Sequence, residues 1–222
     1  MSNTYFYHMM KTGGRSIVSS FQHYHHHTEC DENCQTYLPQ FDQYYCSLYL
    51  QYFKKRPKYI RQDHIPFYNA QKFVPTYDYT ITVIRDPLER LLSHYRMLLL
   101  HRTTSWSGES DNPKWVNKGI DFFIEKFPVM YKIHQLSFFS PTLNVDEALD
   151  NIKKTTQIIL TENMQEGLDK FSIKTDIKLK ECRTGVSKIQ VHDIDKKYVD
   201  KMKKLLSLEY LFYEKVLNYY YK

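Results

Sequence analysis

A short glycine-containing loop, Lys11-Thr12-Gly13-Gly14-Arg15-Ser16, is the first segment of this sequence whose residue types could do chemistry. The apolar run from Tyr5 to Met10 before it is typical of a strand, and Ser16 to Tyr24 after it is typical of a helix. Adjacent glycines let the backbone approach an anion, and N–H groups at a helix start point toward that anion. Lys11 and the hydroxyls of Thr12 and Ser16 add charge and donors. The pattern predicts a phosphate-binding loop, and an ordinary tight turn with a surface lysine fits it about equally well.

A second candidate segment begins where the β-branched run Thr80 to Ile84 ends. Arg85 follows this run directly, and Ser93 lies two helical turns further on. Arginine suits a terminal phosphate because its planar group donates two parallel hydrogen bonds and keeps its charge. The helix between them has strong start signals, because Asp86 can cap it and Pro87 fits its first turn. In the alternative interpretation Arg85 pairs with Asp86 or Glu89, and Ser93 lies on the helix surface.

The elements that would position these residues alternate between strand and helix patterns. We expect short strands at Tyr59–Arg61 and Gln157–Leu160, and helices at Pro87–Leu100, Gly119–Phe127, Asp146–Lys154 and Asn163–Phe171. Apolar residues recur at helical spacing from Val199 to Tyr220, with a break near Ser207. This alternation predicts an α/β fold of three layers, with helices flanking a central, largely parallel sheet. We expect one domain over residues 1–222, with a P-loop-like fold, although the glycine loop is not a Walker A loop because its lysine precedes the glycines.

Length, charge and hydropathy restrict the class of protein. The chain has 222 residues, enough to bury a sizeable core, and its formal net charge is +6. This excess favours an anionic ligand without separating nucleic acid, nucleotide and acidic polysaccharide. No apolar run reaches the roughly 18–20 residues of a membrane span, and the N-terminus lacks a secretory pattern. We expect a soluble chain without a membrane segment, cytoplasmic as written or Golgi-lumenal if an anchor was removed.

Cysteine and histidine residues offer a metal-site alternative. The four cysteines (Cys30, Cys34, Cys46 and Cys182) are too few and too scattered for a disulfide framework. The segment from His23 to Cys34 contains four histidines and two cysteines, but its spacing fits no common zinc pattern. A histidine-rich polar surface segment is the favoured interpretation, and we expect no metal.

Taken together, the two candidate segments resemble the carbohydrate sulfotransferases that use 3′-phosphoadenosine 5′-phosphosulfate (PAPS). The Lys11-Thr12-Gly13-Gly14 loop is similar to the loop that holds the 5′-phosphosulfate in that family. The stretch from Arg85 to Ser93 is similar to the family's R-D-P-x-x-R-x-x-S segment, which holds the 3′-phosphate. The resemblance implies PAPS as co-substrate, bound by residues 11–16 together with Arg85 and Ser93.

A closer resemblance is to the uronyl 2-O-sulfotransferases that modify heparan and dermatan sulfate. It is carried by His64-Ile65-Pro66-Phe67, Leu136-Ser137-Phe138-Phe139-Ser140, Leu160-Thr161-Glu162-Asn163 and Arg183-Thr184-Gly185. It extends from about Tyr5 to the C-terminus, thinly between Gln22 and Lys58. The family's H-x-H reads Gln62-Asp63-His64 here, and Arg15 stands where a small hydroxyl residue is usual. The implied acceptor is the 2-O position of a uronic acid in a glycosaminoglycan-like polysaccharide.

The resemblance also implies roles for individual residues. His64 would be the general base, because a sugar hydroxyl must lose its proton and imidazole titrates near neutral pH. Lys11 would stabilise charge that develops on the leaving oxygen. Weaker nominations are Thr184 and Ser187 for the adenosine side, and Arg183, His8, Lys114 and Lys118 for the acceptor.

Two other classes of function remain open on the sequence alone. A P-loop-like kinase should carry its lysine after the glycines and an acidic magnesium ligand at a strand end, for which Glu162 is the only candidate. A non-catalytic basic module binding acidic polysaccharide or RNA is suggested by the net charge and the 20 tyrosines. Its clearest basic cluster, between Lys196 and Lys204, has helical spacing and is more typical of a solvated face. We expect an acidic glycan rather than nucleic acid as the partner.

Overall fold

The fold is built on one parallel sheet. The computed structural model describes residues 4–27, 60–71, 74, 77–103, 118–182 and 194–222. Within these ranges the strands are β1 (Thr4–Tyr7), β2 (Ile60–Asp63), β3 (Tyr79–Ile84) and β4 (Gln157–Leu160). They form a four-stranded sheet in the order β2-β1-β3-β4, and each neighbouring pair is parallel. The expected α/β class with a parallel sheet is confirmed.

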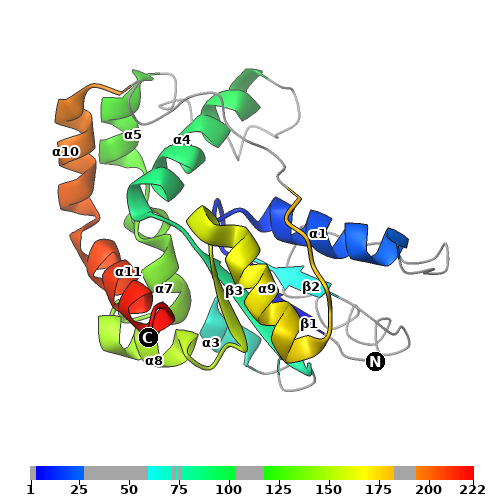
Figure 1. Cartoon of the computed structure of the whole chain (residues 1–222). Helices are drawn as coiled ribbons and strands as arrows, with labels where there is room; N and C mark the ends of the chain where they lie inside the picture. The colour runs from blue at the N-terminus through cyan, green and yellow to red at the C-terminus, as the bar shows by residue number, and fades with distance from the viewer. Residues whose placement is uncertain (1–3, 28–59, 72–73, 75–76, 104–117, 183–193) are drawn as a thin grey trace.

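The helices connect the strands and extend beyond them (Figure 1). They are α1 (Gly14–His27), α3 (Phe67–Ala70), α4 (Pro87–Thr103), α5 (Ile120–Lys126), α6 (Val129–Lys132), α7 (His134–Phe139), α8 (Val145–Ile152), the 3-10 helix η3 (Thr161–Asn163), α9 (Met164–Thr175), α10 (Lys196–Leu205) and α11 (Ser207–Tyr220). None of the helices in the described ranges is both long and apolar enough to cross a membrane.

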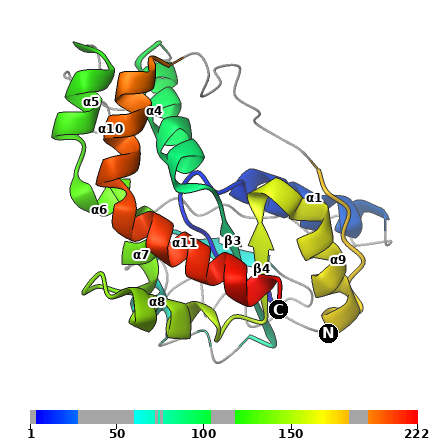
Figure 2. The same cartoon turned by 60° about the vertical axis from the view of Figure 1, so that its left-hand side comes forward.

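Alternating side chains of the strands face two different cores. Phe6, Ile81, Val83 and Ile159 pack with residues of α1 and α9 on one face. Tyr5, Tyr7, Ile84, Ile158 and Leu160 pack with residues of α3, α7, α8 and α11 on the other. Figure 2 shows the sheet between α9 on one side and α7, α8 and α11 on the other. Both faces are therefore covered by helices, as is usual for a parallel sheet.

A third apolar cluster lies away from the sheet. Leu88, Leu91 and Leu92 of α4 pack with Phe123 and Ile124 of α5 and with Met202 of α10. Since α4 begins three residues after β3, this helical group extends from the carboxyl ends of the strands. This group of helices borders the space outside the carboxyl ends of the strands.

Most predicted elements are present, with shifted ends. The break predicted near Ser207 separates α10 from α11, and α4 starts at Pro87 as predicted. The first strand, predicted to reach Met10, ends at Tyr7, and α1 begins inside the glycine loop at Gly14. Helices α3, α6 and α7 were not predicted, because they have only four, four and six residues and show no helical period.

Candidate functional site

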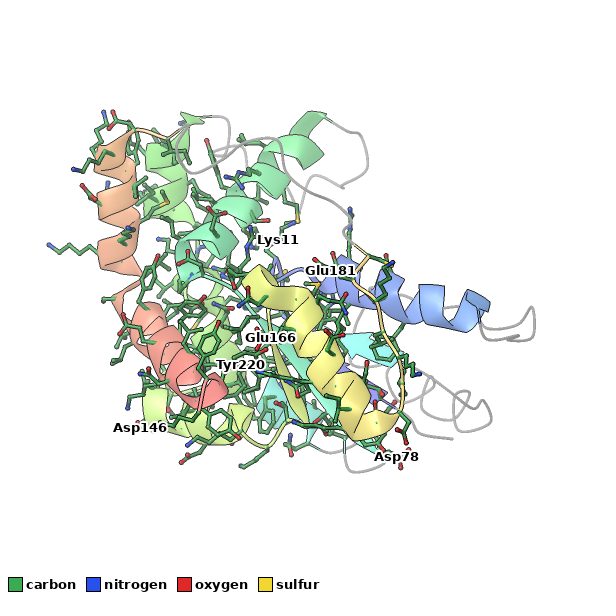
Figure 3. The ribbon with its side chains drawn as sticks, viewed as in Figure 1. Lys11, Asp78, Asp146, Glu166, Glu181 and Tyr220 are labelled. Atoms are coloured by element: carbon green, nitrogen blue, oxygen red, sulfur yellow. The ribbon has the colours of Figure 1, made fainter. Side chains whose placement is uncertain are left out.

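The strand order itself indicates where a ligand would bind. From β1 the chain passes through α1 to β2, whereas from β3 it passes to β4 on the opposite side. In open α/β sheets, ligands bind outside the carboxyl ends of strands at such a reversal. Figure 3 shows Lys11 at this edge of the sheet and Asp78, which precedes β3, at the other. The glycine loop and Arg85 follow the two strands that flank the reversal.

The glycine loop has a specific backbone conformation. Lys11 has φ 69° and Gly13 has φ 91°, both in the left-handed region, which residues other than glycine adopt rarely and often at functional sites. The Thr12 hydroxyl donates to the Met9 carbonyl at 3.0 Å, and the Ser16 N–H donates to the Gly13 carbonyl at 2.9 Å. These groups therefore hold the loop. The amides of Gly14 and Arg15 lie in the first turn of α1, where a helix offers no intrahelical acceptor.

Gly14 is required by a close approach of His8. A Cβ added at position 14 would lie 1.8 Å from Nε2 of His8, so a residue with a side chain would displace the His8 ring. The His8 ring stacks on Phe6 with their centroids 4.8 Å apart, and it faces His64 at 4.3 Å. The glycine loop and His64 are thus linked through a single imidazole ring.

His64 is placed by strand register. Tyr7 pairs with Asp63, so the residues that follow them, His8 and His64, leave the sheet side by side. Nδ1 of His64 lies 2.7 Å from the His8 carbonyl oxygen. Because a carbonyl only accepts, Nδ1 carries the hydrogen and the lone pair of Nε2 is left to accept a proton.

The imidazole of His64 favours its neutral form. Its pKa is lowered, chiefly by burial, and also by the charge of Lys11, while the hydrogen bond to His8 opposes the shift. The residue keeps part of its surface exposed to solvent. A neutral, accessible imidazole near a cationic lysine is suited to accept a proton.

Arg85 reaches the glycine loop from the neighbouring strand. Its Nη1 donates to the Lys11 carbonyl at 3.3 Å, and its Nη2 forms an ion pair with Glu89 at 3.2 Å. The pairing with Glu89 that was considered from the sequence is therefore present, together with a contact to the loop. Ser93 lies two turns along α4 and is partly buried. The structure brings Arg85 and Lys11 together at one edge.

Thr161, the first residue after β4, connects the same two segments. Its hydroxyl oxygen lies 2.8 Å from the Thr12 carbonyl oxygen and 3.1 Å from that of Ile84. Thr161 belongs to the Leu160-Thr161-Glu162-Asn163 motif, but the sequence predicted no role for this residue itself. The role comes from register, because Ile84 and Leu160 are paired and Thr161 therefore emerges beside Arg85.

Positive charge accumulates at this edge. The pKa of Lys11 is lowered to about 8, first by burial and then by the charges of Arg15 and Arg85. The imidazoles of His94 and His134 add no charge near neutral pH, because their pKa values are lowered to about 3, mainly by burial and also by the charge of Arg90. Lys11, Arg15 and Arg85 repel one another, and a bound anion would reduce this repulsion.

Arg90 belongs to the fold rather than to a ligand site. It is fully buried, its Nη2 donates to the carbonyls of Tyr131 (2.7 Å) and Lys132 (2.6 Å), and its Nε lies 3.9 Å from Glu209. No role was predicted from the sequence for Arg90, His94, His134 or Glu209. Arg90 is the second arginine of the R-D-P-x-x-R pattern, which marks the residue without indicating that it is buried.

Several predicted residues lie away from the site or outside the described residues. Lys118 is exposed before α5, with Nζ 5.1 Å above the Phe122 ring. The following lie outside the described residues: Arg183, Thr184, Ser187, Lys114, Cys30, Cys34 and Cys46. The five lysines between Lys196 and Lys204 are exposed, as expected for a solvated face.

The carboxylate considered as a magnesium ligand, Glu162, has a main-chain partner, whereas the side chains of the segment His23–Cys34, considered as a metal site, lie outside the described part of the chain. Oε1 of Glu162 accepts the N–H of Asp86 at 2.8 Å, so this carboxylate holds the turn after β3. In the part of the chain that the structure describes, no group of three or more His, Cys, Asp or Glu side chains could hold a metal ion. The site therefore presents cationic and imidazole groups.

No family model matches the chain, and no curated protein matches it in sequence. The interpretation of the site therefore depends on its geometry and on the motifs quoted above.

Proposed function

We propose that this protein is a sulfotransferase that moves a sulfuryl group from PAPS to a sugar hydroxyl. The observation that carries the proposal is the hydrogen bond from Arg85 to the Lys11 carbonyl at the carboxyl edge of the sheet. It joins the two segments whose sequence resembles the 5′-phosphosulfate and 3′-phosphate sites of PAPS-dependent enzymes. A P-loop-like fold belongs to this proposal, and the glycine loop between β1 and α1 supports it.

On the donor side, two groups of residues would hold the two ends of the nucleotide. The Lys11 ammonium and the amides of Gly14 and Arg15 suit the 5′-phosphosulfate, because a helix start favours anions. Arg85 suits the 3′-phosphate, with Ser93 as a further donor. Thr184 and Ser187 remain proposals for the adenosine side. No metal is required, since these cationic groups neutralise the phosphates.

On the acceptor side, His64 would act as the general base. Nε2 takes the proton of the attacking sugar hydroxyl, and the hydroxyl oxygen forms a bond to sulfur. The bond between sulfur and the phosphate oxygen breaks, and 3′-phosphoadenosine 5′-phosphate leaves with that electron pair. Lys11 stabilises the negative charge on the leaving oxygen. Sulfuryl transfer depends, like phosphoryl transfer, on positioning and electrostatics.

The proposed acceptor is an acidic polysaccharide, with the 2-O position of a uronic acid as the position modified. The net charge of +6 supports an anionic partner. Arg183 suits a carboxylate because of its two parallel donors, and His8, Lys114 and Lys118 are further candidates.

The proposal is tested by two measurements on the intact chain. Calorimetric titration should show stronger binding of 3′-phosphoadenosine 5′-phosphate than of ATP, because only the former carries the 3′-phosphate. Radiolabelled PAPS should transfer its sulfate to a hexuronic polysaccharide. Equal or reversed nucleotide affinities would contradict the proposal, and binding without transfer would indicate a non-catalytic module.

A further inference from the structure

Gln135, in α7, forms hydrogen bonds to the main chain of Arg85 with both the oxygen and the nitrogen of its side-chain amide. Oε1 accepts the Arg85 N–H at 2.8 Å, and Nε2 donates to the Arg85 carbonyl at 2.9 Å. Gln135 is fully buried. A single side chain therefore satisfies both main-chain groups of the residue that carries the candidate phosphate-binding guanidinium.

The position of Arg85 explains why such a contact is needed. The β3–β4 register ends at the pair Ile84 and Leu160, so Arg85 is the first residue beyond the ladder. Main-chain groups with limited access to water are costly when they lack partners. The next amide, of Asp86, is held by Glu162 at 2.8 Å. Side chains from two other elements thus fix two successive amides at the end of β3.

Gln135 is itself held by the C-terminal helix. Glu209 of α11 is fully buried, and its two carboxylate oxygens accept the N–H groups of Gln135 (2.9 Å) and Leu136 (3.0 Å). These are the second and third amides of α7, which have no acceptor within that helix. The chain of contacts runs from Glu209 through Gln135 to Arg85.

We propose that Gln135 is a positioning residue for the 3′-phosphate site. Gln135 does not touch the nucleotide. It fixes the main chain of Arg85, so that the guanidinium is already oriented toward the Lys11 carbonyl and the phosphate before the nucleotide binds. Fixing a long side chain before binding lowers the entropy lost when the ligand binds. This inference rests on the proposed function.

The test compares variants of two buried glutamines: Gln135, which contacts Arg85, and Gln157, in β4. Gln135→Met removes the amide but keeps length and apolar volume, and Gln157→Met does the same in β4, at the start of that strand. Affinities are measured for 3′-phosphoadenosine 5′-phosphate and for adenosine 5′-phosphate. Gln135→Met should weaken binding of the first ligand about tenfold and leave the second unchanged. Gln157→Met should change neither. Equal losses for both ligands, or no loss, would overturn the positioning role.

A second measurement needs no nucleotide. Hydrogen exchange of the Arg85 amide should be slow in the wild type, at least tenfold faster in Gln135→Met, and unchanged in Gln157→Met. If wild type shows no preference for the 3′-phosphate, the proposed function fails while the exchange result still decides whether Gln135 holds Arg85. Faster exchange with unchanged discrimination between ligands overturns the positioning role alone. Gln135→Asn, one methylene too short, replaces Gln135→Met if that variant does not fold.

Discussion

Nη1 of Arg85 donates to the carbonyl oxygen of Lys11 at 3.3 Å, across 74 residues of sequence. The two residues follow neighbouring parallel strands, so their meeting is a consequence of the strand order. A cationic guanidinium and a cationic ammonium are thereby placed at the same edge of the sheet. The following predictions depend on this arrangement and on the buried groups around it.

Arg85→Ala should weaken binding of 3′-phosphoadenosine 5′-phosphate by roughly 2–4 kcal/mol, as for the loss of a charge-assisted pair in a closed site. The loss should nearly vanish for adenosine 5′-phosphate, which lacks the 3′-phosphate. Isothermal titration with both ligands measures this difference. Equal losses would mean that Arg85 supports the loop rather than binding that phosphate.

His64→Ala should lower sulfate transfer about 10²–10⁴-fold, the usual contribution of a general base. Affinity for 3′-phosphoadenosine 5′-phosphate should barely change, because Nε2 of His64 takes the proton of the sugar hydroxyl and does not bind the nucleotide. Transfer of radiolabelled sulfate and titration of the nucleotide give the two numbers. A variant that transfers at the wild-type rate would remove His64 from the mechanism, and His8 would be examined next.

The pH dependence of kcat/KM should have two limbs. The rate rises as His64 loses its proton, with a midpoint below pH 6.5 because the pKa of His64 is lowered. It falls around pH 8, because the pKa of Lys11 is about 8 and only the charged lysine stabilises the leaving group. Lys11→Arg should lose the alkaline limb, since arginine does not titrate in this range. A rate that stays constant to pH 9 in the wild type contradicts this role of Lys11.

Glu209→Gln should destabilise the fold by about 3 kcal/mol, because it leaves the buried charge of Arg90 without its counter-charge. The amide oxygen can still accept one of the two α7 N–H groups, so the single loss contains the charge together with one hydrogen bond. Urea unfolding of the single variants and of Arg90→Met/Glu209→Gln completes the comparison. The double variant should lose less than the sum of the single losses, and additivity within about 0.5 kcal/mol would show that the pair is not coupled.

Acid should destabilise the protein through His94 and His134. Their pKa values in the folded state are about 3, whereas an unfolded histidine titrates near 6.5. The unfolded chain therefore binds more protons below pH 6.5, and the free energy of unfolding falls by up to about 1.4 kcal/mol per pH unit for each histidine. Urea midpoints at pH 7.5 and 5.5 measure this slope. His94→Gln/His134→Gln should flatten it, and an unchanged slope would contradict the assignment.

Local signals in the sequence predicted part of the architecture correctly. The β-branched run before Arg85 forms β3, and Asp86 caps α4 as predicted, since its Oδ1 accepts the Glu89 N–H at 2.9 Å. The glycine loop lies between a strand and a helix, as predicted. These features depend on neighbours in sequence, so composition and spacing are enough to predict them.

The contacts that hold the site together were beyond such reasoning. Gln135 contacts Arg85 across 50 residues, and Glu209 contacts Gln135 across 74. Neither residue belongs to a motif with its partner, and α7 is too short to show a period. The burial of Arg90 was likewise not predictable, because a charged residue is seldom buried without a partner and its partner is distant in sequence.

The contact between Gly14 and His8 has a consequence for substitutions at position 14. A methyl group at position 14 would lie 1.8 Å from the His8 ring, so the ring would have to leave its present position. That movement would take away the ring against which His64 packs. A substitution at position 14 that leaves the loop able to bind its anion should therefore still disturb the candidate base, even though Gly14 contributes no side chain of its own.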